Sequence, residues 1–486
     1  MKLFKKLTAL TIALATTVMC TACGGNEVSF EDDESQEYTI AWYYVVNKKG
    51  NVEPIEAELN KYLKDKINAK IDLVPLEWGE YSNKTQNALA GGEKIDLVWV
   101  SGATYTKYAY DDTIIDIDEL MSEYAPKTRE MLGEEFIDGA RVNGKIYGVQ
   151  ANKDKAGYSQ LVYRKDLTDK YGIEVPEEVS SWEELYPVFD AIKEKEPNMY
   201  PFAIGSGRSP WAIRQDVENL GGTLVGFVDN SDTVVNLWET DEFKESAAIA
   251  KEMFDRGYMN KDCATNEKVS DFISQGKAFS RLEAGHTSKI NELNSNEKKF
   301  VWGGVKMNNI LTRTSNAIGS MQAIPFSCQN PVRVMKFIEL YNTDAYIRNL
   351  INFGIEGVNY DKVSDKIIKM REGSGYGDAS MQWVFGNTFG NYILDSEDPE
   401  KDEKMMAFNE QTTYSKYLGF VPDLSDYNTE TTACTNALGK YRQVMEFGVS
   451  STDEYLDQLN KELKASGIDT LIEEVQRQYD EWKKLK

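Results

Sequence analysis

Nine tryptophans and 79 carboxylates are the side chains of this 486-residue chain that are best suited to holding a ligand. An indole ring offers a flat apolar face for stacking, and carboxylates and amides offer planar groups that hydrogen-bond to hydroxyls. Histidine chemistry is nearly excluded, because the one histidine, His286, cannot by itself form a two-histidine zinc site or an HExxH motif. The residue types favour stacking and hydrogen bonding, and we expect no cofactor and no bound metal.

The charge of the chain argues against one class of partner. It has 55 Lys plus Arg and 79 Asp plus Glu, which gives a net charge of -24. A protein that binds DNA or RNA needs a basic face to neutralise phosphates, and an acidic surface would repel them. We therefore expect no nucleic-acid partner. The length predicts two or three domains or lobes, and the 41% hydrophobic residues allow a sizeable core.

Two apparent motifs do not hold up. Residues 139–145 fit the pattern G-x-x-x-x-G-K, but Ile146 follows where a phosphate-binding loop needs Ser or Thr to hold magnesium. The pair Asn143-Gly144 is better explained as a hairpin turn. Residues 111–119 are acidic but lack the glycine of an EF-hand loop, so they do not indicate calcium.

The N-terminal segment predicts export. Residues 1–22 contain three lysines and an apolar run that is too short to span a bilayer, which is typical of a cleaved signal peptide. Cys20–Cys23 resembles the bacterial lipobox, so Cys23 is the expected site of lipid attachment. Residues 23–37 are Gly-rich and then acidic, and they predict a self-repelling flexible tether. The remaining cysteines are Cys263, Cys328 and Cys434. Three cysteines are too few for a disulfide framework, although a single disulfide between two of them remains open.

The body of the chain begins with alternating strands and helices. Strands are predicted at 38–46, 70–76 and 94–100, and helices at 51–67 and 80–92. This alternation predicts a parallel sheet covered by helices, in which ligands bind beyond the carboxyl ends of the strands. The residues near those ends are Trp42, Tyr43, Tyr44, Glu77, Trp78, Trp99, Ser101 and Gly102.

Further blocks carry a family resemblance. They are NGKIYGVQANKD (143–154), FISQGKAFSRLEAGH (272–286), residues 325–360, QWVFGN (382–387) and the tail at 464–482. Together with the N-terminal features, they resemble the extracellular solute-binding lipoproteins of carbohydrate-type bacterial ABC importers, family 1, in the branch with a C-terminal extension. The resemblance covers essentially the whole chain.

The resemblance implies a periplasmic-binding-protein-like α/β fold, with two lobes joined by a hinge around a ligand cleft. It places crossings near 147–152, 318–323 and 357–360. The implied division is a first lobe at 38–150, a second lobe at 151–317, a return to the first lobe at 318–358, and second-lobe completion with a C-terminal helical extension at 359–486.

A sugar would need aromatic faces and polar groups in that cleft. Three tryptophans have structural explanations: Trp182 at a helix start, Trp238 in a strand and Trp482 in the stripe of the last helix. His286 is placed near the cleft but is better explained as structural. The remaining tryptophan candidates are Trp42, Trp78, Trp99, Trp211, Trp302 and Trp383, and the polar candidates are Glu77, Ser101, Asn152, Glu283, Glu356 and Asn387. For each tryptophan a place in the core is the alternative, and for Glu283 and Glu356 a structural cap or ion pair.

The resulting hypothesis is a monomeric, non-enzymatic binding protein, held by its lipid on the extracellular face of the cell membrane. It would capture a carbohydrate, an oligosaccharide in our interpretation, by lobe closure and deliver it to ABC permease subunits. Two alternatives stay open at this point. One is an exported glycoside hydrolase, which needs only two suitably spaced carboxylates. The other is a solute-binding lipoprotein for peptides or other ligands.

Overall fold

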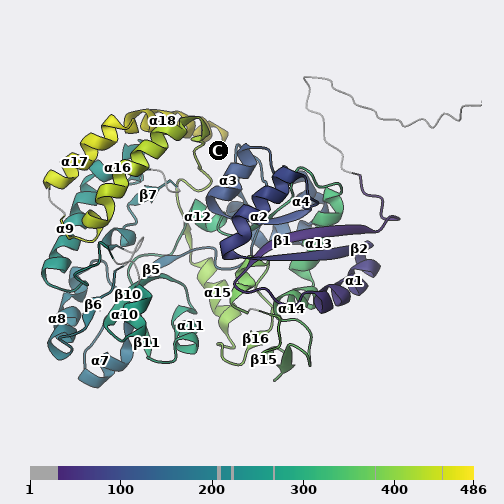
Figure 1. The fold of residues 1–486 in the computed structure, drawn as a ribbon, viewed down its shortest axis with the longest axis horizontal. Helices are drawn as coiled ribbons and strands as arrows, with labels where there is room; N and C mark the ends of the chain where they lie inside the picture. The colour runs from purple at the N-terminus through teal and green to yellow at the C-terminus, as the bar shows by residue number, and fades with distance from the viewer. Residues whose placement is uncertain (1–30, 205–208, 221–223, 266–268, 378, 451–452) are drawn as a thin grey trace, which may run out of the picture.

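The computed structural model describes residues 31–486 except 205–208, 221–223, 266–268, 378 and 451–452. The expected signal peptide and Cys23 therefore lie outside the described residues. Two α/β lobes stand side by side, and the last helices lie along one edge of the second lobe (Figure 1). No helix in the described part of the chain combines the length and apolar character needed to cross a membrane.

A five-stranded sheet forms the centre of the first lobe. Its order is β2 (Ala69–Glu77), β1 (Tyr38–Val46), β3 (Leu97–Val100), β13 (Met321–Ala323) and β4 (Val149–Gln150). Strand β1 pairs in parallel with β2 and β3, so the expected parallel sheet is confirmed for these strands. The strand β13 enters antiparallel to β3, from a segment far along the chain.

Helices cover this sheet through their apolar faces. In α1 (Glu53–Ile67), Ile55, Leu59 and Leu63 are buried, which is the stripe that the sequence predicts. Asn68 then ends α1 in the left-handed conformation, and the chain turns into β2. The other helices of this lobe are α2 (Trp78–Gly91), α3 (Gly102–Tyr110), α4 (Asp118–Tyr124), α5 (Pro126–Leu132), α6 (Glu134–Asp138), α12 (Thr314–Ala317), α13 (Pro331–Thr343) and α14 (Ala345–Phe353).

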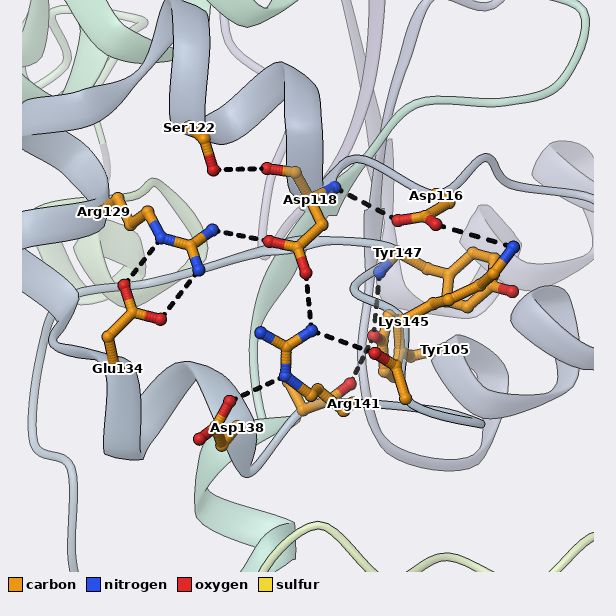
Figure 2. A network of polar contacts seen from close by, with 12 residues as sticks. Tyr105, Asp116, Asp118, Ser122, Arg129, Glu134, Asp138, Arg141, Lys145 and Tyr147 are labelled. Carbon is orange, nitrogen blue, oxygen red and sulfur yellow. Dashed lines mark hydrogen bonds and ion pairs between the residues drawn. The ribbon is translucent and has the colours of Figure 1, made fainter. Parts of the chain in front are cut away.

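A polar network joins the short helices α4 to α6 (Figure 2). Asp118 accepts hydrogen bonds from Arg129 and Arg141, at 2.7 and 2.6 Å. Arg129 also binds Glu134, and Arg141 binds Asp138. One carboxylate therefore holds two arginines from different parts of this region, next to strand β4 and the start of the first crossing.

The predicted hairpin at Asn143-Gly144 is present. Both residues have positive φ, 50° and 79°, and Val142 and Lys145 exchange backbone hydrogen bonds of 2.9 and 3.0 Å. These angles fit a type I′ turn, which favours an Asn-Gly pair. The glycine of the apparent phosphate-binding motif therefore serves a turn.

The second lobe has a four-stranded mixed sheet. Its order is β11 (Trp302–Lys306), β5 (Tyr158–Arg164), β10 (Ala278–Gly285) and β6 (Tyr200–Phe202), and β5 runs antiparallel to both of its neighbours. Trp182 packs inside this lobe and donates to the carbonyl of Pro210, as expected for a structural tryptophan. The helices here are η1 (Glu183–Leu185), α7 (Lys165–Tyr171), α8 (Tyr186–Lys195), η2 (Pro210–Ile213), α9 (Asp241–Asp255), α10 (Val269–Ser274) and α11 (Lys289–Asn296).

The chain passes between the sheets more than once. It leaves the first sheet after β4 and enters the second at β5, and it returns between β11 and β13. We propose this as the division into lobes, close to the first two expected crossings. The short strands β12 (Leu311–Thr312) and β17 (Thr413–Tyr414) pair in parallel on the connecting segments.

The third crossing lies later than the sequence predicts. Residues 379–385 pack into the core of the first lobe, where Met381, Val384 and Phe385 are buried with Trp42. The expected boundary at 359 is therefore wrong, because a buried apolar run ties this segment to the first sheet. The elements concerned are β14 (Tyr360–Lys362), β15 (Ile367–Met370), η4 (Ala379–Val384), β16 (Ile393–Leu394) and α15 (Lys401–Glu410).

The C-terminal helices share a core with an excursion of the second lobe. Phe227 lies between Tyr417, stacked at 4.2 Å, and Tyr479 at 4.6 Å. Trp482 packs on Phe420 at 5.5 Å, as the apolar stripe of the last helix predicts. The elements are β7 (Val217–Asn219), β8 (Val225–Val228), β9 (Val235–Asn236), η3 (Leu237–Glu239), η5 (Ser425–Tyr427), α16 (Asn428–Glu446), α17 (Asp453–Ala465) and α18 (Ile468–Leu485).

Two smaller expectations need comment. Trp238 lies in η3 and not in a strand, because the Asn236 side chain caps this 3₁₀ turn by accepting from the Trp238 amide at 3.1 Å. The three cysteines of the body, Cys263, Cys328 and Cys434, are buried and free.

Part of the acidic segment is not a free tether. Asp32 is buried against α13, where its carboxylate accepts from Arg333 at 2.6 and 3.1 Å and from Lys336 at 3.0 Å. The side chain of Asp32 is 4% exposed, and that of Arg333 is 0% exposed. The flexible-tether prediction is therefore wrong for residues 31–37, because a buried cation on α13 offsets the repulsion among the acids.

Candidate functional site

Three tryptophans meet at the carboxyl end of the first sheet. Trp78 follows β2, Trp99 lies in β3, and Trp383 comes from η4. The rings of Trp78 and Trp383 are stacked, with centroids 6.1 Å apart and planes 19° apart. Trp99 meets both rings edge-on, at 5.6 Å from Trp78 and 6.1 Å from Trp383. We call this group the tryptophan cluster.

Hydrogen bonds fix the rings of the cluster. The Trp99 indole donates to Ser320 Oγ at 2.9 Å, and Ser320 in turn donates to the carbonyl of Trp383 at 2.8 Å. Tyr81 also donates to the carbonyl of Trp99, at 2.5 Å. Trp99 is therefore held from two sides and is 6% exposed, so it forms the floor of the cluster.

Trp78 is the open member of the cluster. It is 48% exposed, which is unusual for a tryptophan, and its indole donates to Asn47 Oδ1 at 3.1 Å. Asn47 also donates to Ser380 Oγ at 3.2 Å. The loop after β1 and the segment containing η4 thus hold the exposed ring from both sides, and Trp383 beside it is half-buried.

Two predicted polar residues lie at the same end of the sheet. Glu77 is exposed at the start of α2, and its Oε1 accepts the Lys49 backbone N–H at 3.2 Å. Ser101 is half-buried at the start of α3. Glu80, one turn into α2, has its pKa lowered to about 2 by hydrogen bonds from Lys49 and Lys84.

The structure places Trp42 and Tyr44 in the core and not at a surface. Trp42 is 0% exposed, with its indole on Gln322 Oε1 at 2.9 Å and its ring against Tyr341 and Phe385. Tyr44 is 2% exposed beside Phe385. The prediction that Trp42 and Tyr44 contact the ligand is therefore wrong, because a sugar could stack on either ring only if the core opened. Tyr43 points elsewhere, with its hydroxyl 3.4 Å from Glu93.

Asn152 and Asn387 serve the crossing segments. Asn152 Nδ2 donates to Asn387 Oδ1 at 3.0 Å, and the backbone carbonyl of Asn152 accepts from Thr388. Asn387 also binds Asn342 on α13 through its backbone N–H. Both asparagines are buried, and their side chains face each other. They join the first crossing to the later one, which favours a structural role over the predicted contact with ligand.

The second-lobe candidates divide in the same way. Trp302 is 1% exposed and lies under the Arg281 guanidinium at 4.8 Å, so its predicted ligand contact is corrected to core packing. Glu283 accepts from Arg281 Nε at 2.6 Å, which matches its structural alternative. Trp211 is half-buried in η2, 5.2 Å from Phe243, and remains a candidate.

Two candidates lie on loops. Glu356 is exposed and pairs with Lys362 at 3.2 Å, away from the tryptophan cluster, so the structure does not bring it to the site. His286 Nε2 lies 3.4 Å from Glu292 on α11, as expected for a structural histidine.

Sequence reasoning missed the polar residues that hold the cluster. Asn47 was passed over although it directly follows the first strand, which is the position that the strand-end rule selects. Ser320, Ser380 and Tyr81 carry no such signal, because they reach the cluster through contacts between segments that are far apart in sequence.

Two α/β lobes joined by crossing segments, with aromatic rings at the strand ends of one lobe, define a periplasmic-binding-protein-like architecture. Residues 39–278 match the model of the bacterial extracellular solute-binding protein family. Residues 416–484 match a second model, a domain of unknown function (DUF3502), which covers most of the C-terminal helices.

Relatives support this assignment. The chain is 29% identical, over 100% of both chains, to a carbohydrate ABC transporter substrate-binding protein of Streptococcus pneumoniae serotype 4 (strain ATCC BAA-334 / TIGR4). It also resembles the crystal structure of the N-glycan transport solute-binding protein NgtS from Streptococcus pneumoniae. That match has a TM-score of 0.81 and 25% identity and covers 91% of this chain and 98% of that one. The NgtS complex with Man5GlcNAc matches with a TM-score of 0.69 and 27% identity, over 92% and 99%.

Proposed function

We propose that the protein is the substrate-binding component of a bacterial ABC importer, and that it captures an oligosaccharide outside the cell. The observation that carries this proposal is the stacked, half-open pair Trp78 and Trp383 at the carboxyl ends of the first-lobe strands. Such a face fits the C–H patches of a pyranose ring. The relatives add support, because NgtS is described in complexes with Man1GlcNAc and Man5GlcNAc.

Capture would be non-covalent and would use lobe closure. A ligand shifts the open and closed populations only by its different affinity for the two states, so contacts from both lobes are needed. We place Trp78, Trp99 and Trp383 on the first-lobe side and Trp211 on the second. The chain matches the NgtS structure with a TM-score of 0.81 but its complex with Man1GlcNAc with 0.71. That difference fits a protein whose lobes change orientation when sugar binds.

We infer no hydrolytic activity. A glycoside hydrolase needs one carboxylic acid that stays protonated near neutral pH. Beside the tryptophan cluster, Glu80 is paired with Lys49 and Lys84, so it is not placed to serve as that protonated acid. The relatives are described as binding proteins, which agrees with this inference.

The N-terminal residues bear on where the protein is located in the cell. We propose that Cys23 carries the lipid, that the chain stays on the extracellular face of the membrane as a monomer, and that a membrane permease receives the sugar. The lipobox-like residues Cys20–Cys23 support the anchor.

The proposal is tested by the melting temperature of the purified protein against mono- and oligosaccharides, mannose-containing chains among them. A ligand at 100 times its Kd stabilises the native state by about 2.7 kcal/mol. We expect a selective rise, with the sugar recovered intact. Cleaved sugar would contradict the binding role. A rise with peptides alone would contradict the ligand class.

A further inference from the structure

A second hollow lies in the first lobe, beside the tryptophan cluster. It is a cavity of about 360 Å³ between the loop after β1 and the segment that follows β15. Aromatic side chains line its inner part: Tyr44, Tyr376 and Phe385. Basic side chains line its rim: Lys48, Lys49 and Arg371. We call it the basic cavity.

The charge of its lining departs from that of the whole chain. The protein has a net charge of -24, yet the described residues that line this cavity include three basic side chains and no acidic one. Lys49 is neutralised by Glu80, and Arg371 by Asp361 at 2.5 Å. Lys48 is exposed, and within the described residues its ammonium has no ion pair or hydrogen bond. One cation of the rim is therefore available to a ligand.

The floor of the cavity contains an acceptor that lacks a donor. Asn352 is 2% exposed and lines the cavity. Its Nδ2 donates to the carbonyl of Arg348 at 2.9 Å, but its Oδ1 is buried with no hydrogen-bond partner among the described residues. A buried acceptor without a donor costs free energy, so such groups are normally satisfied. A ligand hydroxyl that enters the cavity would satisfy this one.

One acid lies close behind the cavity. After burial, the charge of Glu56 also raises the pKa of the Tyr44 and Tyr376 hydroxyls. The Oε1 of Glu56 accepts the Leu73 N–H at 2.7 Å, and burial raises the pKa of Glu56 itself. Glu56 does not line the cavity. Because no described lining residue is acidic, a negative group at the rim would meet Lys48 without a lining carboxylate beside it.

The basic cavity adjoins the tryptophan cluster through one residue. Asn47 directly precedes Lys48, and its side chain binds both the Trp78 indole and Ser380. A sugar chain stacked on Trp78 could therefore continue past Asn47 into the cavity. The two places would act as neighbouring subsites of one extended site.

We propose that the basic cavity binds the carboxylate-bearing residue of an acidic oligosaccharide. Lys48 would pair with the carboxylate in a charge-assisted hydrogen bond, and Asn352 Oδ1 would accept a hydroxyl of the same ring. This inference rests on the proposed capture of a carbohydrate and narrows its class. It adds a charge requirement that stacking alone cannot supply.

The test compares sodium D-glucuronate with D-glucose by ligand-observed NMR titration of the purified protein. These sugars differ at one carbon, where a carboxylate replaces a hydroxymethyl group. We expect glucuronate to bind at least about tenfold more tightly, which corresponds to about 1.4 kcal/mol, and we expect this preference to shrink as salt is raised. Equal affinities, or an equal absence of binding, would overturn the proposal.

Variants locate the effect. Lys48→Met should remove the preference for glucuronate, while Lys49→Met, whose ammonium already pairs with Glu80, should change it by less than about twofold. Asn352→Asp should weaken glucuronate by placing a like charge in the cavity, and its melting curve would report on folding. An unchanged preference in Lys48→Met would overturn the proposal.

A neutral oligosaccharide separates this inference from the proposed function. Binding of a neutral chain that depends on Trp383 but not on Lys48, without any glucuronate preference, would keep sugar capture and reject the acidic subsite. Loss of glucuronate binding in Trp383→Ala with full retention in Lys48→Met would place the acid on the tryptophan cluster and also reject it.

Discussion

The indole of Trp78 stacks on that of Trp383 at 6.1 Å, although the two residues come from the beginning and the last third of the chain. The pair forms because Trp78 directly follows β2, while the segment containing η4 returns to the first lobe and packs Val384 and Phe385 into its core. An apolar anchor thus positions an exposed aromatic surface. Several measurable consequences follow from this and from the contacts around it.

Replacing Trp383 tests the stacking surface directly. We expect Trp383→Ala to weaken oligosaccharide binding by at least about tenfold, because it removes half of the stacked pair. Calorimetry gives the affinity. Trp482→Ala is the matched control, since Trp482 is also half-buried but packs on Phe420 in the C-terminal core. Equal affinities for Trp383→Ala and the wild type would contradict the stacking role.

Replacing Trp42 should affect stability and not recognition. Its side chain is fully buried among aromatic rings, so Trp42→Ala should lower the free energy of unfolding by about 3–5 kcal/mol. Urea unfolding measures this. Affinity measured well below the midpoint should stay within about threefold of the wild type. A large loss of affinity in a variant of normal stability would return Trp42 to the site.

The Asp32–Arg333 pair should make stability depend on acid. Burial alone would raise the Asp32 pKa, but hydrogen bonds from Arg333, Asn330 and Lys336 lower it from 3.8 to about 2. Because the pKa of Asp32 is lower in the native state, its ionised carboxylate stabilises the fold at every pH above its pKa in the unfolded chain. This contribution, about 2 kcal/mol, is lost as the pH falls from about 4 through 2.

Asp32→Asn should therefore be less stable than the wild type at pH 6, and the difference should shrink below pH 4. Unfolding curves across this range measure it. Asp33→Asn is a nearby control, because Asp33 does not reach Arg333 with its side chain and binds Ser35 instead. A difference that stays constant with pH would contradict the assignment.

The network in Figure 2 makes a separate prediction. Asp118→Asn should destabilise the first lobe by about 1–3 kcal/mol, because one carboxylate binds both Arg129 and Arg141. Asp111→Asn removes only an exposed pair with Lys107 and should cost less than about 0.5 kcal/mol. If both variants lose a similar amount of unfolding free energy, the carboxylate that Arg129 and Arg141 share contributes no more to stability than an exposed ion pair.

The anchor can be tested in cells. Cys23→Ala should move the protein from the membrane fraction into the medium, since it removes the proposed lipid attachment. Cys20→Ala keeps Cys23 and should leave the protein on the membrane. Fractionation and blotting measure both. Retention of the Cys23→Ala variant on the membrane would reject this anchor.

The local patterns of the sequence predicted the start of the fold well. The stripe Ile55, Leu59 and Leu63 and the turn at Asn143-Gly144 depend on neighbouring residues, and both are present. The same patterns could not tell Trp42 from Trp78. Trp42 lies in β1 and Trp78 directly follows β2 of the same sheet, but α13 and η4 cover Trp42, and their packing depends on residues far along the chain.

Long-range contacts also explain the errors in the later part. The boundary expected at 359 failed because Met381 and Phe385 return to the first core, which no linker composition announces. The acidic segment was expected to be free because its charges repel. Arg333, buried and 301 residues away, attracts Asp32.

The buried ion pairs between Asp32 and α13 have a mechanical consequence. A pull on the chain ahead of residue 31 would reach the first lobe through Arg333 and Lys336, which both lie on α13. The first lobe would then be the stationary part of the molecule relative to the point of attachment. The second lobe, which the crossing segments join to the first, would be the part that swings.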